Sequence, residues 1–343
     1  MGVVDAGYHR IMIFPAFATW PAAAPPTGVI LGQPSACTQW PAQSCKAANN
    51  GNPLASASVY ANPAGVACTK SQPTDVACTG GDLFLADSGN NRVLDLPVQA
   101  STLGDATRVL GQDYLYENSA NLIEGREFQF SGPFANSNLV DAGMAIDNSS
   151  GTPHLYVADP YNNRVLGFKD LRTFKNGAKN KADIVLGQAD FTTELINYPS
   201  GLATSPNKSG LYRPVGLLVD AKGNLYVADS GNGRVLRFPA PFSYTDKAPE
   251  PADLVLGQQS FTSTITDPTS TNMTYPYGLA FSPSCNTPSQ ACDAPNGLLV
   301  SDQYDNRVLY IPTTNGTFVA GNDNGESGNH CIRTAELQQH RLR

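Results

Sequence analysis

One twelve-residue phrase occurs four times along the chain, and a weaker fifth copy lies at its start. It reads Leu-Tyr-Val-Ala-Asp-Ser-Gly-Asn-Gly-Arg-Val-Leu at 225–236, and close variants occupy 83–94, 155–166 and 298–309. All copies, including the one at 3–12, place an Arg five residues after an Asp, and successive Asp residues are 82, 72, 70 and 73 positions apart. A repeat of this period predicts an array of structural units. The pairs are Asp5 and Arg10, Asp87 and Arg92, Asp159 and Arg164, Asp229 and Arg234, and Asp302 and Arg307.

Two further phrases run in phase with the first. Val-Leu-Gly-Gln follows the Asp at 109–112, 185–188 and 255–258, and Val-Ile-Leu-Gly-Gln stands at 29–33. An apolar run containing Gly precedes the Asp, as in Pro-Val-Gly-Leu-Leu-Val-Asp at 214–220. Each unit therefore has four short apolar runs, separated by Gly, Asn and Pro turn signals. We place these units at 60–112, 139–188, 212–258 and 275–321, after a partial unit at 1–33 and before a tail at 322–343, within one domain 1–343.

Four β-rich runs with tight turns predict a four-stranded antiparallel sheet. Such a sheet cannot bury both of its faces alone, and radial stacking of several sheets solves this problem in a β-propeller. A β-sandwich does not require a repeated sequence, and the coils of a β-solenoid are usually shorter than these units. The predicted fold class is therefore all-β, a β-propeller of four-stranded antiparallel blades with four largely complete blades and a partial one.

The Pro-x-Gly run followed by Leu-Tyr-Val-Ala-Asp-Ser-x-Asn-x-Arg-Val resembles the NHL repeat, and the Leu-Gly-Gln phrase is similar to a bacterial subgroup with long units. The resemblance implies a propeller that usually has six blades, so we expect the chain to be a fragment. The alternative is that the tail supplies a missing first strand and closes a ring of five. NHL propellers include RNA-binding and protein-binding modules, and relatives that are calcium- or zinc-dependent lyases and lactonases. The resemblance therefore does not settle the function.

The charge balance argues against a nucleic-acid surface. The formal net charge is −7, and only 15% of the residues are charged. Nucleic-acid binding requires a basic patch, and the most basic stretch, 169–181, is better explained as a solvated loop. The partners that we expect are a protein or a carbohydrate.

Six of the seven cysteines form three close pairs, which we predict to be the disulfides Cys37–Cys45, Cys68–Cys78 and Cys285–Cys292. Two of these pairs hold equivalent positions in two units, and local disulfides persist in oxidising compartments. The spacings of seven, nine and six intervening residues do not match zinc-ligand pairs. No apolar run reaches the length of a membrane span. We therefore expect a secreted or periplasmic bacterial protein.

Long connections link each Leu-Gly-Gln phrase to the next unit, and we expect them to share one face with the Asp-to-Arg turns. Long loops on a rigid scaffold commonly carry function. Aromatic side chains in these connections suit contact with a protein or a carbohydrate, although they could instead pack the loops onto the blades. The candidate binding residues are Trp40, Tyr60, Tyr114, Tyr116, Phe128, Phe191, Tyr198, Phe261 and Tyr275.

The repeated Asp and Arg residues are predicted to be structural, because a catalytic group is not needed once per blade. Asp can cap the turn, and Arg can pair with it or with backbone. The enzymatic alternative is a lyase or lactonase with calcium or zinc in the central channel. Asp141, Asp147 and Asp220 lie near first strands without forming a matching ring, and the chain has only four His residues. We therefore predict no catalytic residue, no metal ligand and no cofactor, although a calcium ion is possible.

Overall fold

The computed structural model describes the backbone of five antiparallel sheets and most of the connections between four of them. Helical segments within this part of the chain are three-residue 3-10 turns. The described residues are 2–5, 8–14, 29–33, 56, 58, 60, 63–68, 81–99, 102–103, 105–119, 122–130, 142–175, 180–243, 250–265, 272–283, 295–313, 318 and 330–333.

Each sheet takes its strands from consecutive runs of one repeat unit, and neighbouring strands within a sheet are antiparallel. The first sheet holds β1 (Gly2–Asp5), β2 (Arg10–Ile13) and β3 (Val29–Leu31). The second holds β4 (Pro63–Cys68), β5 (Asp82–Asp87), β6 (Arg92–Gln99) and β8 (Arg108–Leu110), with β7 (Thr102–Leu103) beside the end of β6. The third holds β9 (Met144–Asp147), β10 (His154–Asp159), β11 (Arg164–Phe168) and β12 (Ile184–Leu186). The fourth holds β13 (Pro214–Val219), β14 (Leu225–Asp229), β15 (Arg234–Phe238) and β16 (Leu254–Leu256), and the fifth holds β17 (Pro276–Pro283), β18 (Pro295–Asp302), β19 (Arg307–Pro312) and β20 (His330–Arg333).

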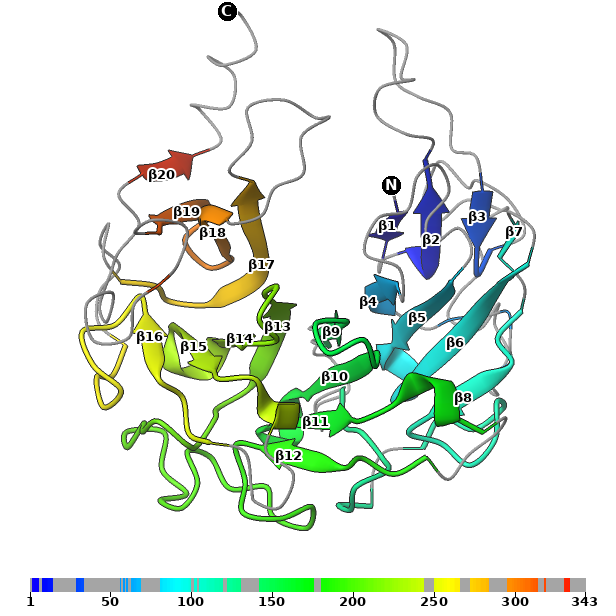
Figure 1. Cartoon of the computed structure of the whole chain (residues 1–343), viewed down its shortest axis with the longest axis horizontal. Coiled ribbons are helices and arrows are strands. Elements are labelled where there is room, and N and C mark those ends of the chain that lie inside the picture. The colour runs from blue at the N-terminus through cyan, green and yellow to red at the C-terminus, as the bar shows by residue number, and fades with distance from the viewer. Residues whose placement is uncertain are drawn as a thin grey trace, which may run out of the picture.

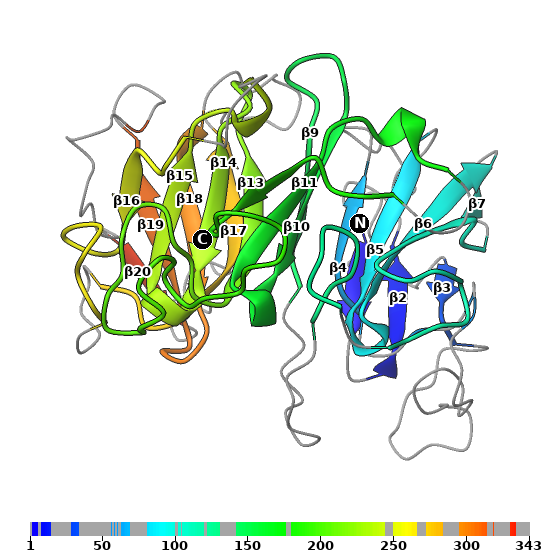
Figure 2. The same ribbon diagram turned by 90° about the horizontal axis from the view of Figure 1, so that it is seen from below.

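The sheets stand around a common centre as the blades of a β-propeller, with the first strand of each sheet innermost (Figure 1), and Figure 2 shows the same blades from below. The innermost strands contact one another in chain order, β1 with β4, β4 with β9, β9 with β13 and β13 with β17. The predicted fold class is thereby confirmed, and the Pro-x-Gly run forms an innermost strand at β4, β13 and β17.

Four apolar clusters fill the spaces between successive blades. In β10, Leu155 and Val157 pack toward the second blade, whereas Tyr156 and Ala158 pack toward the fourth. Side chains alternate between the two faces of a strand, and both faces are covered here. This double coverage explains why the second run of each unit is continuously apolar instead of alternating with polar residues.

The fifth blade differs from the expected order at its outer edge. We expected this unit to end at residue 321, followed by a tail at 322–343. The structure pairs β19 with β20, which lies within the segment assigned to that tail.

Candidate functional site

The Asp and Arg of each repeat form an ion pair inside the turn between the second and third strands. Arg92 Nε lies 2.7 Å from Asp87 Oδ2, and the corresponding distance is 2.8 Å in the third and fourth blades. All six side chains of these three pairs are completely buried. The outer pairs, Asp5 with Arg10 and Asp302 with Arg307, also approach to 2.8 Å.

Besides its ion pair with Arg, the Asp carboxylate accepts hydrogen bonds from other groups. We expected it to cap the turn directly, but no side-chain cap bond reaches the backbone of the 3-10 turns. Instead, Asp159 Oδ2 accepts from the Asn162 side chain at 2.8 Å, and Asp159 Oδ1 accepts from the Gln129 backbone N–H at 2.7 Å. Asp229 accepts in the same way from Tyr212 N–H at 2.7 Å. The carboxylate therefore fixes the connection that arrives from the preceding blade.

The Arg guanidinium reaches backbone carbonyls in both neighbouring connections. Arg164 donates to Phe191 O at 2.6 Å and to Glu127 O at 3.3 Å. Arg234 repeats the arrangement with Phe261 O at 2.5 Å and Asn207 O at 2.8 Å. These bonds place the turns and the connections on one side of the blades, as expected, and we call this side the loop face. In the described part of the chain it comprises turns 87–92, 159–164, 229–234 and 302–307 and connections 111–119, 122–130, 188–213, 258–265 and 272–275.

The Leu-Gly-Gln phrase fastens the outermost strand to the same turn. Gln188 Nε2 donates to Asn163 O at 2.9 Å, and Gln258 Nε2 donates to Gly233 O at 3.1 Å. The Gly of the phrase has a positive φ, +91° at Gly187, and a Cβ there would lie 2.8 Å from Asn163 O. The close approach and the left-handed backbone both require glycine. The phrase thus has a structural role in these blades.

Three of the predicted binding aromatics are buried, which corrects their assignment to a contact surface. Tyr60, Phe128 and Tyr275 are 2%, 0% and 5% exposed. Tyr60 and Phe128 cover the Leu-Gly-Gln glycine of the preceding blade, where a Cβ would lie 2.4 Å from either ring. Burial raises the pKa of Tyr60, and the charge of Asp87 adds to the rise. These rings pack the connections onto the blades, as the alternative interpretation held.

The other predicted aromatics lie nearer the solvent. Phe191, Tyr198 and Phe261 are half-buried, whereas Tyr114 and Tyr116 are 56% and 52% exposed. The rings of Tyr114 and Tyr116 stack in parallel with their centroids 5.3 Å apart. The Glu117 carboxylate accepts the Tyr114 backbone N–H at 3.1 Å and holds the turn beneath them. Trp40 and the side chains of the seven cysteines lie outside the described residues.

Exposed large apolar side chains are confined to the loop face within the described ranges. Every one belongs to a connection or to an Asp-to-Arg turn, and the opposite face carries none of them. They are Tyr114, Tyr116, Leu122, Leu195, Leu202, Ile265 and Tyr304.

A row of rings and one cation crosses the inner edge of the loop face from the third blade to the fifth. The Arg213 guanidinium lies 5.0 Å from the Tyr161 ring centroid and 5.9 Å from that of Tyr275. Tyr275 stacks in turn on the exposed Tyr304, with the centroids 4.6 Å apart. Because each member is held by the next, this edge is pre-formed.

The loop face also carries a carboxyl group that titrates near neutrality. Burial, followed by the adjacent Glu124, raises the pKa of Glu127 to about 7. Arg126 lies against Glu124 and 3.8 Å from Glu127. The charge of this connection therefore changes close to physiological pH.

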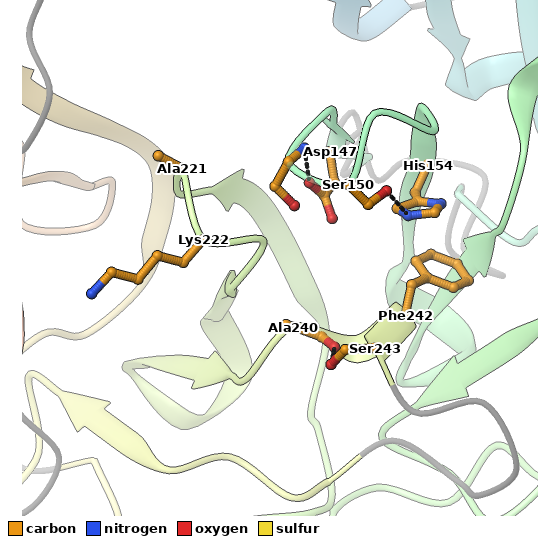
Figure 3. A pocket seen from close by; sticks show the side chains of 9 residues that line it. Asp147, Ser150, His154, Ala221, Lys222, Ala240, Phe242 and Ser243 are labelled. Atoms are coloured by element: carbon orange, nitrogen blue, oxygen red, sulfur yellow. Dashed lines mark hydrogen bonds between the residues drawn. The ribbon is translucent and has the colours of Figure 1, made fainter.

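A pocket of about 300 Å³ opens on the opposite face, between the third and fourth blades (Figure 3). In the third blade, Asp147 ends β9, Ser150 lies in the following turn and His154 begins β10, whereas the fourth blade supplies Lys222 and Phe242. Ser150 Oγ lies 2.9 Å from His154 Nε2, and the Phe242 ring stacks on the imidazole at 4.4 Å. The sequence pattern does not indicate this pocket, because its walls come from two different blades.

The residues considered for metal binding do not come together in the described part of the chain, where no three His, Cys, Asp or Glu residues form a cluster that could hold an ion. Asp147 lies in the pocket between two blades, and Asp220 accepts bonds from its own turn. Asp141 lies outside the described residues. No helix among those described has the length and hydropathy to cross a membrane.

Residues 211–238 match the sequence profile of the NHL repeat. Similar solved structures include a nidogen/laminin complex at 15% identity, with 81% of this chain and 65% of that chain covered and a TM-score of 0.39. A virginiamycin B lyase from Staphylococcus aureus with quinupristin is 12% identical, with 74% of this chain and 53% of that chain covered and a TM-score of 0.34. An auxiliary nutrient binding protein from Bacteroides thetaiotaomicron is 8% identical, with 72% of this chain and 47% of that chain covered and a TM-score of 0.39. The chain thus spans about half to two thirds of these proteins, and no curated protein matches it.

Proposed function

We propose that this chain, an NHL-repeat β-propeller, is an extracytoplasmic binding scaffold whose loop face contacts a protein or a glycan. The observation that carries the proposal is the placement of exposed large apolar side chains, which the described residues present on the loop face alone. Exposed apolar side chains gathered on one face favour an interaction surface. Tyr is also enriched at protein interfaces because it combines a large apolar ring with a polar end.

The stacked pair Tyr114 and Tyr116 is the part of this face that we expect to contribute most. Each ring is about half exposed, and the parallel stack fixes both rings before a partner arrives. A contact residue that is already ordered loses less conformational entropy on binding. Aromatic residues of this kind commonly dominate the binding energy of an interface.

The extracytoplasmic location depends on the cysteine pattern. Three close pairs in the sequence favour local disulfides and hence an oxidising compartment. Mass spectrometry of the non-reduced protein after proteolysis tests this part of the proposal. Linked peptides for Cys37–Cys45, Cys68–Cys78 and Cys285–Cys292 are expected, whereas free thiols at these positions would argue for a reducing compartment.

The binding role is tested with the immobilised chain and its variants. Wild-type protein is exposed to the secreted and cell-surface proteins of the source organism, and separately to a polysaccharide panel. The double variant Tyr114→Ser/Tyr116→Ser is expected to lose the captured partner, by about thirtyfold or more in affinity if the pair is a hot spot. The matched control is Arg172→Ala, because Arg172 is exposed on the opposite face. Equal capture by the wild type and the double variant would refute the role of the loop face.

The metal-dependent lyase or lactonase remains the second hypothesis. Its test is direct, because an ion that binds only the folded chain raises the melting temperature. An increase with calcium or zinc, abolished by a chelator, would favour the enzyme.

A further inference from the structure

We propose that the pocket between the third and fourth blades binds a small molecule that carries a protonated amine. The site lies on the face opposite the loop face, so it is separate from the proposed binding surface. Four observations support it: the strand register, the bonds of Asp147, the contrast with the next blade, and the pocket walls.

The register of the third blade points Asp147 into the space between blades. Asp147 on β9 stands directly opposite His154 on β10, and Ala145 stands opposite Tyr156. Residues two apart on a strand share a face, and Ala145 and Tyr156 pack in the apolar cluster between the third and fourth blades. Asp147 and His154 therefore extend this interblade surface outward to its end, where the pocket opens (Figure 3).

Asp147 is 3% exposed, yet only one of its oxygens has a partner in the described structure. Asp147 Oδ1 accepts the Ser149 backbone N–H at 2.8 Å. Asp147 Oδ2 accepts no hydrogen bond from any described residue, and the carboxylate borders the pocket. This oxygen is not among the fully enclosed atoms that lack a partner, so it opens to the pocket. A ligand that supplies a donor at this point would form a charge-assisted hydrogen bond with it.

Asp220, the equivalent residue of the fourth blade, has an internal hydrogen-bond donor that Asp147 lacks. Asp220 precedes the second strand of the fourth blade as Asp147 precedes that of the third. Asp220 Oδ1 accepts from Lys222 N–H at 2.9 Å and Asn224 N–H at 3.0 Å, and its Oδ2 accepts from the Asn224 side chain at 2.8 Å. His154 takes the place of Asn224 in the third blade, and its ring bonds elsewhere. Asp147 thereby lacks the internal donor that satisfies Asp220.

The imidazole of His154 is held away from Asp147 by two other groups. Its Nδ1 bonds to the Lys169 carbonyl, and because a carbonyl can only accept, Nδ1 carries the hydrogen. In the neutral ring Nε2 then accepts from the Ser150 hydroxyl. The Tyr156 hydroxyl is buried nearby, and burial, followed by the charge of Asp147, raises the pKa of that hydroxyl.

The remaining walls define the chemical class of the ligand. Phe242, Ala221 and Ala240 supply apolar surface, and Figure 3 shows the Lys222 side chain directed away from the Asp147 carboxylate. A carboxylate repels anions, and the described residues offer no third ligand for a metal ion. An ammonium group can donate to Asp147 Oδ2, with charge assistance, while an attached apolar group lies against Phe242. The volume limits the ligand to a small molecule.

The first test needs no variant and compares benzylamine with benzyl alcohol and benzoate. Isothermal titration of the wild-type chain is expected to give saturable binding of benzylamine at millimolar concentration or below. The neutral alcohol is expected to bind about tenfold or more weakly, because it lacks the charge. Benzoate should not bind. Equal affinities for benzylamine and benzyl alcohol, or no saturation by benzylamine at about 10 mM, would overturn the proposal.

The second test locates the amine with the variant Asp147→Asn. Asn retains the oxygen that accepts the Ser149 N–H, so we expect the turn to fold, and it replaces the free oxygen with an NH₂ group. Benzylamine affinity should fall about ten- to a hundredfold. The control Asp190→Asn removes the same charge from an exposed turn on the loop face and should leave the affinity unchanged. An unchanged affinity in Asp147→Asn, with an unchanged melting temperature, would place the amine elsewhere.

Discussion

Replacing Arg164 with Ala removes the group that joins the Asp-to-Arg turn of the third blade to both neighbouring connections. Its side chain is completely buried and donates to Asp159 Oδ2, Phe191 O and Glu127 O. Removal leaves the Asp159 carboxylate buried, with the Asn162 side chain and the Gln129 N–H as its remaining donors. Removing one partner of a buried ion pair leaves the other charge uncompensated, so we expect Arg164→Ala to lower the free energy of unfolding by about 3–5 kcal/mol.

Urea unfolding, followed by far-UV circular dichroism, measures this loss of stability as a lower urea concentration at the unfolding midpoint. The structure also predicts where the variant loosens, since Arg164 holds the connections 122–130 and 188–200 by their carbonyls. Hydrogen exchange should therefore accelerate in both connections, including at the Gln129 amide, before it changes in the strands of the fourth blade.

The matched control is Arg172→Ala, which removes an exposed Arg that pairs with Asp170 on the opposite face. Surface ion pairs contribute little to stability, so this variant should unfold close to the wild type. If Arg164→Ala lost no more stability than Arg172→Ala, the argument that the repeated pair holds the blade would be wrong.

Two further predictions concern stability. Gly187→Ala should lower the melting temperature more than Gly151→Ala does, because both residues have positive φ (+91° and +77°) but only Gly187 meets neighbouring atoms at the Cβ position; equal losses, on the order of 1–3 kcal/mol each, would show that backbone strain alone explains the glycine. Burial, followed by the charge of Asp82, raises the pKa of Asp95 to about 7. The folded state therefore holds a proton that the unfolded state releases near pH 4, so the free energy of unfolding should fall between about pH 4 and pH 7, by at most about 4 kcal/mol. Asp95→Asn should remove most of this decline in urea midpoints, and a variant with the wild-type pH dependence would contradict the assignment.

The fold was predictable because the repeat appears in the sequence itself. The apolar runs and the Asp-to-Arg spacing locate the strands and turns without any knowledge of tertiary contacts. Positive φ at Asn91, Asn163 and Gly233 matches the Gly and Asn turn signals. The Leu-Gly-Gln phrase was recognised as a repeat, but its role depends on a hydrogen bond to a turn more than twenty residues earlier, which sequence spacing does not show.

The candidate sites were harder to predict because burial and pairing are tertiary properties. Tyr60 and Tyr114 both lie in long connections that follow a Leu-Gly-Gln phrase, yet Tyr60 covers a glycine of the preceding blade and Tyr114 faces solvent. The pocket depends on one unpartnered carboxylate oxygen between two blades. One signal was available: His154 stands where the fourth blade has Asn224, and aligning the repeats would have shown that Asp147 lacks its internal donor.

The guanidinium groups of the loop face hold the connections by carbonyl oxygens, which every amino acid possesses. A connection can therefore exchange its side chains, and gain or lose residues between its anchor points, without giving up the bonds that fasten it. Loops are generally tolerant of such change. Recognition can thus diversify while the blades stay constant, and the same framework could present randomised loops in a selection for new binders.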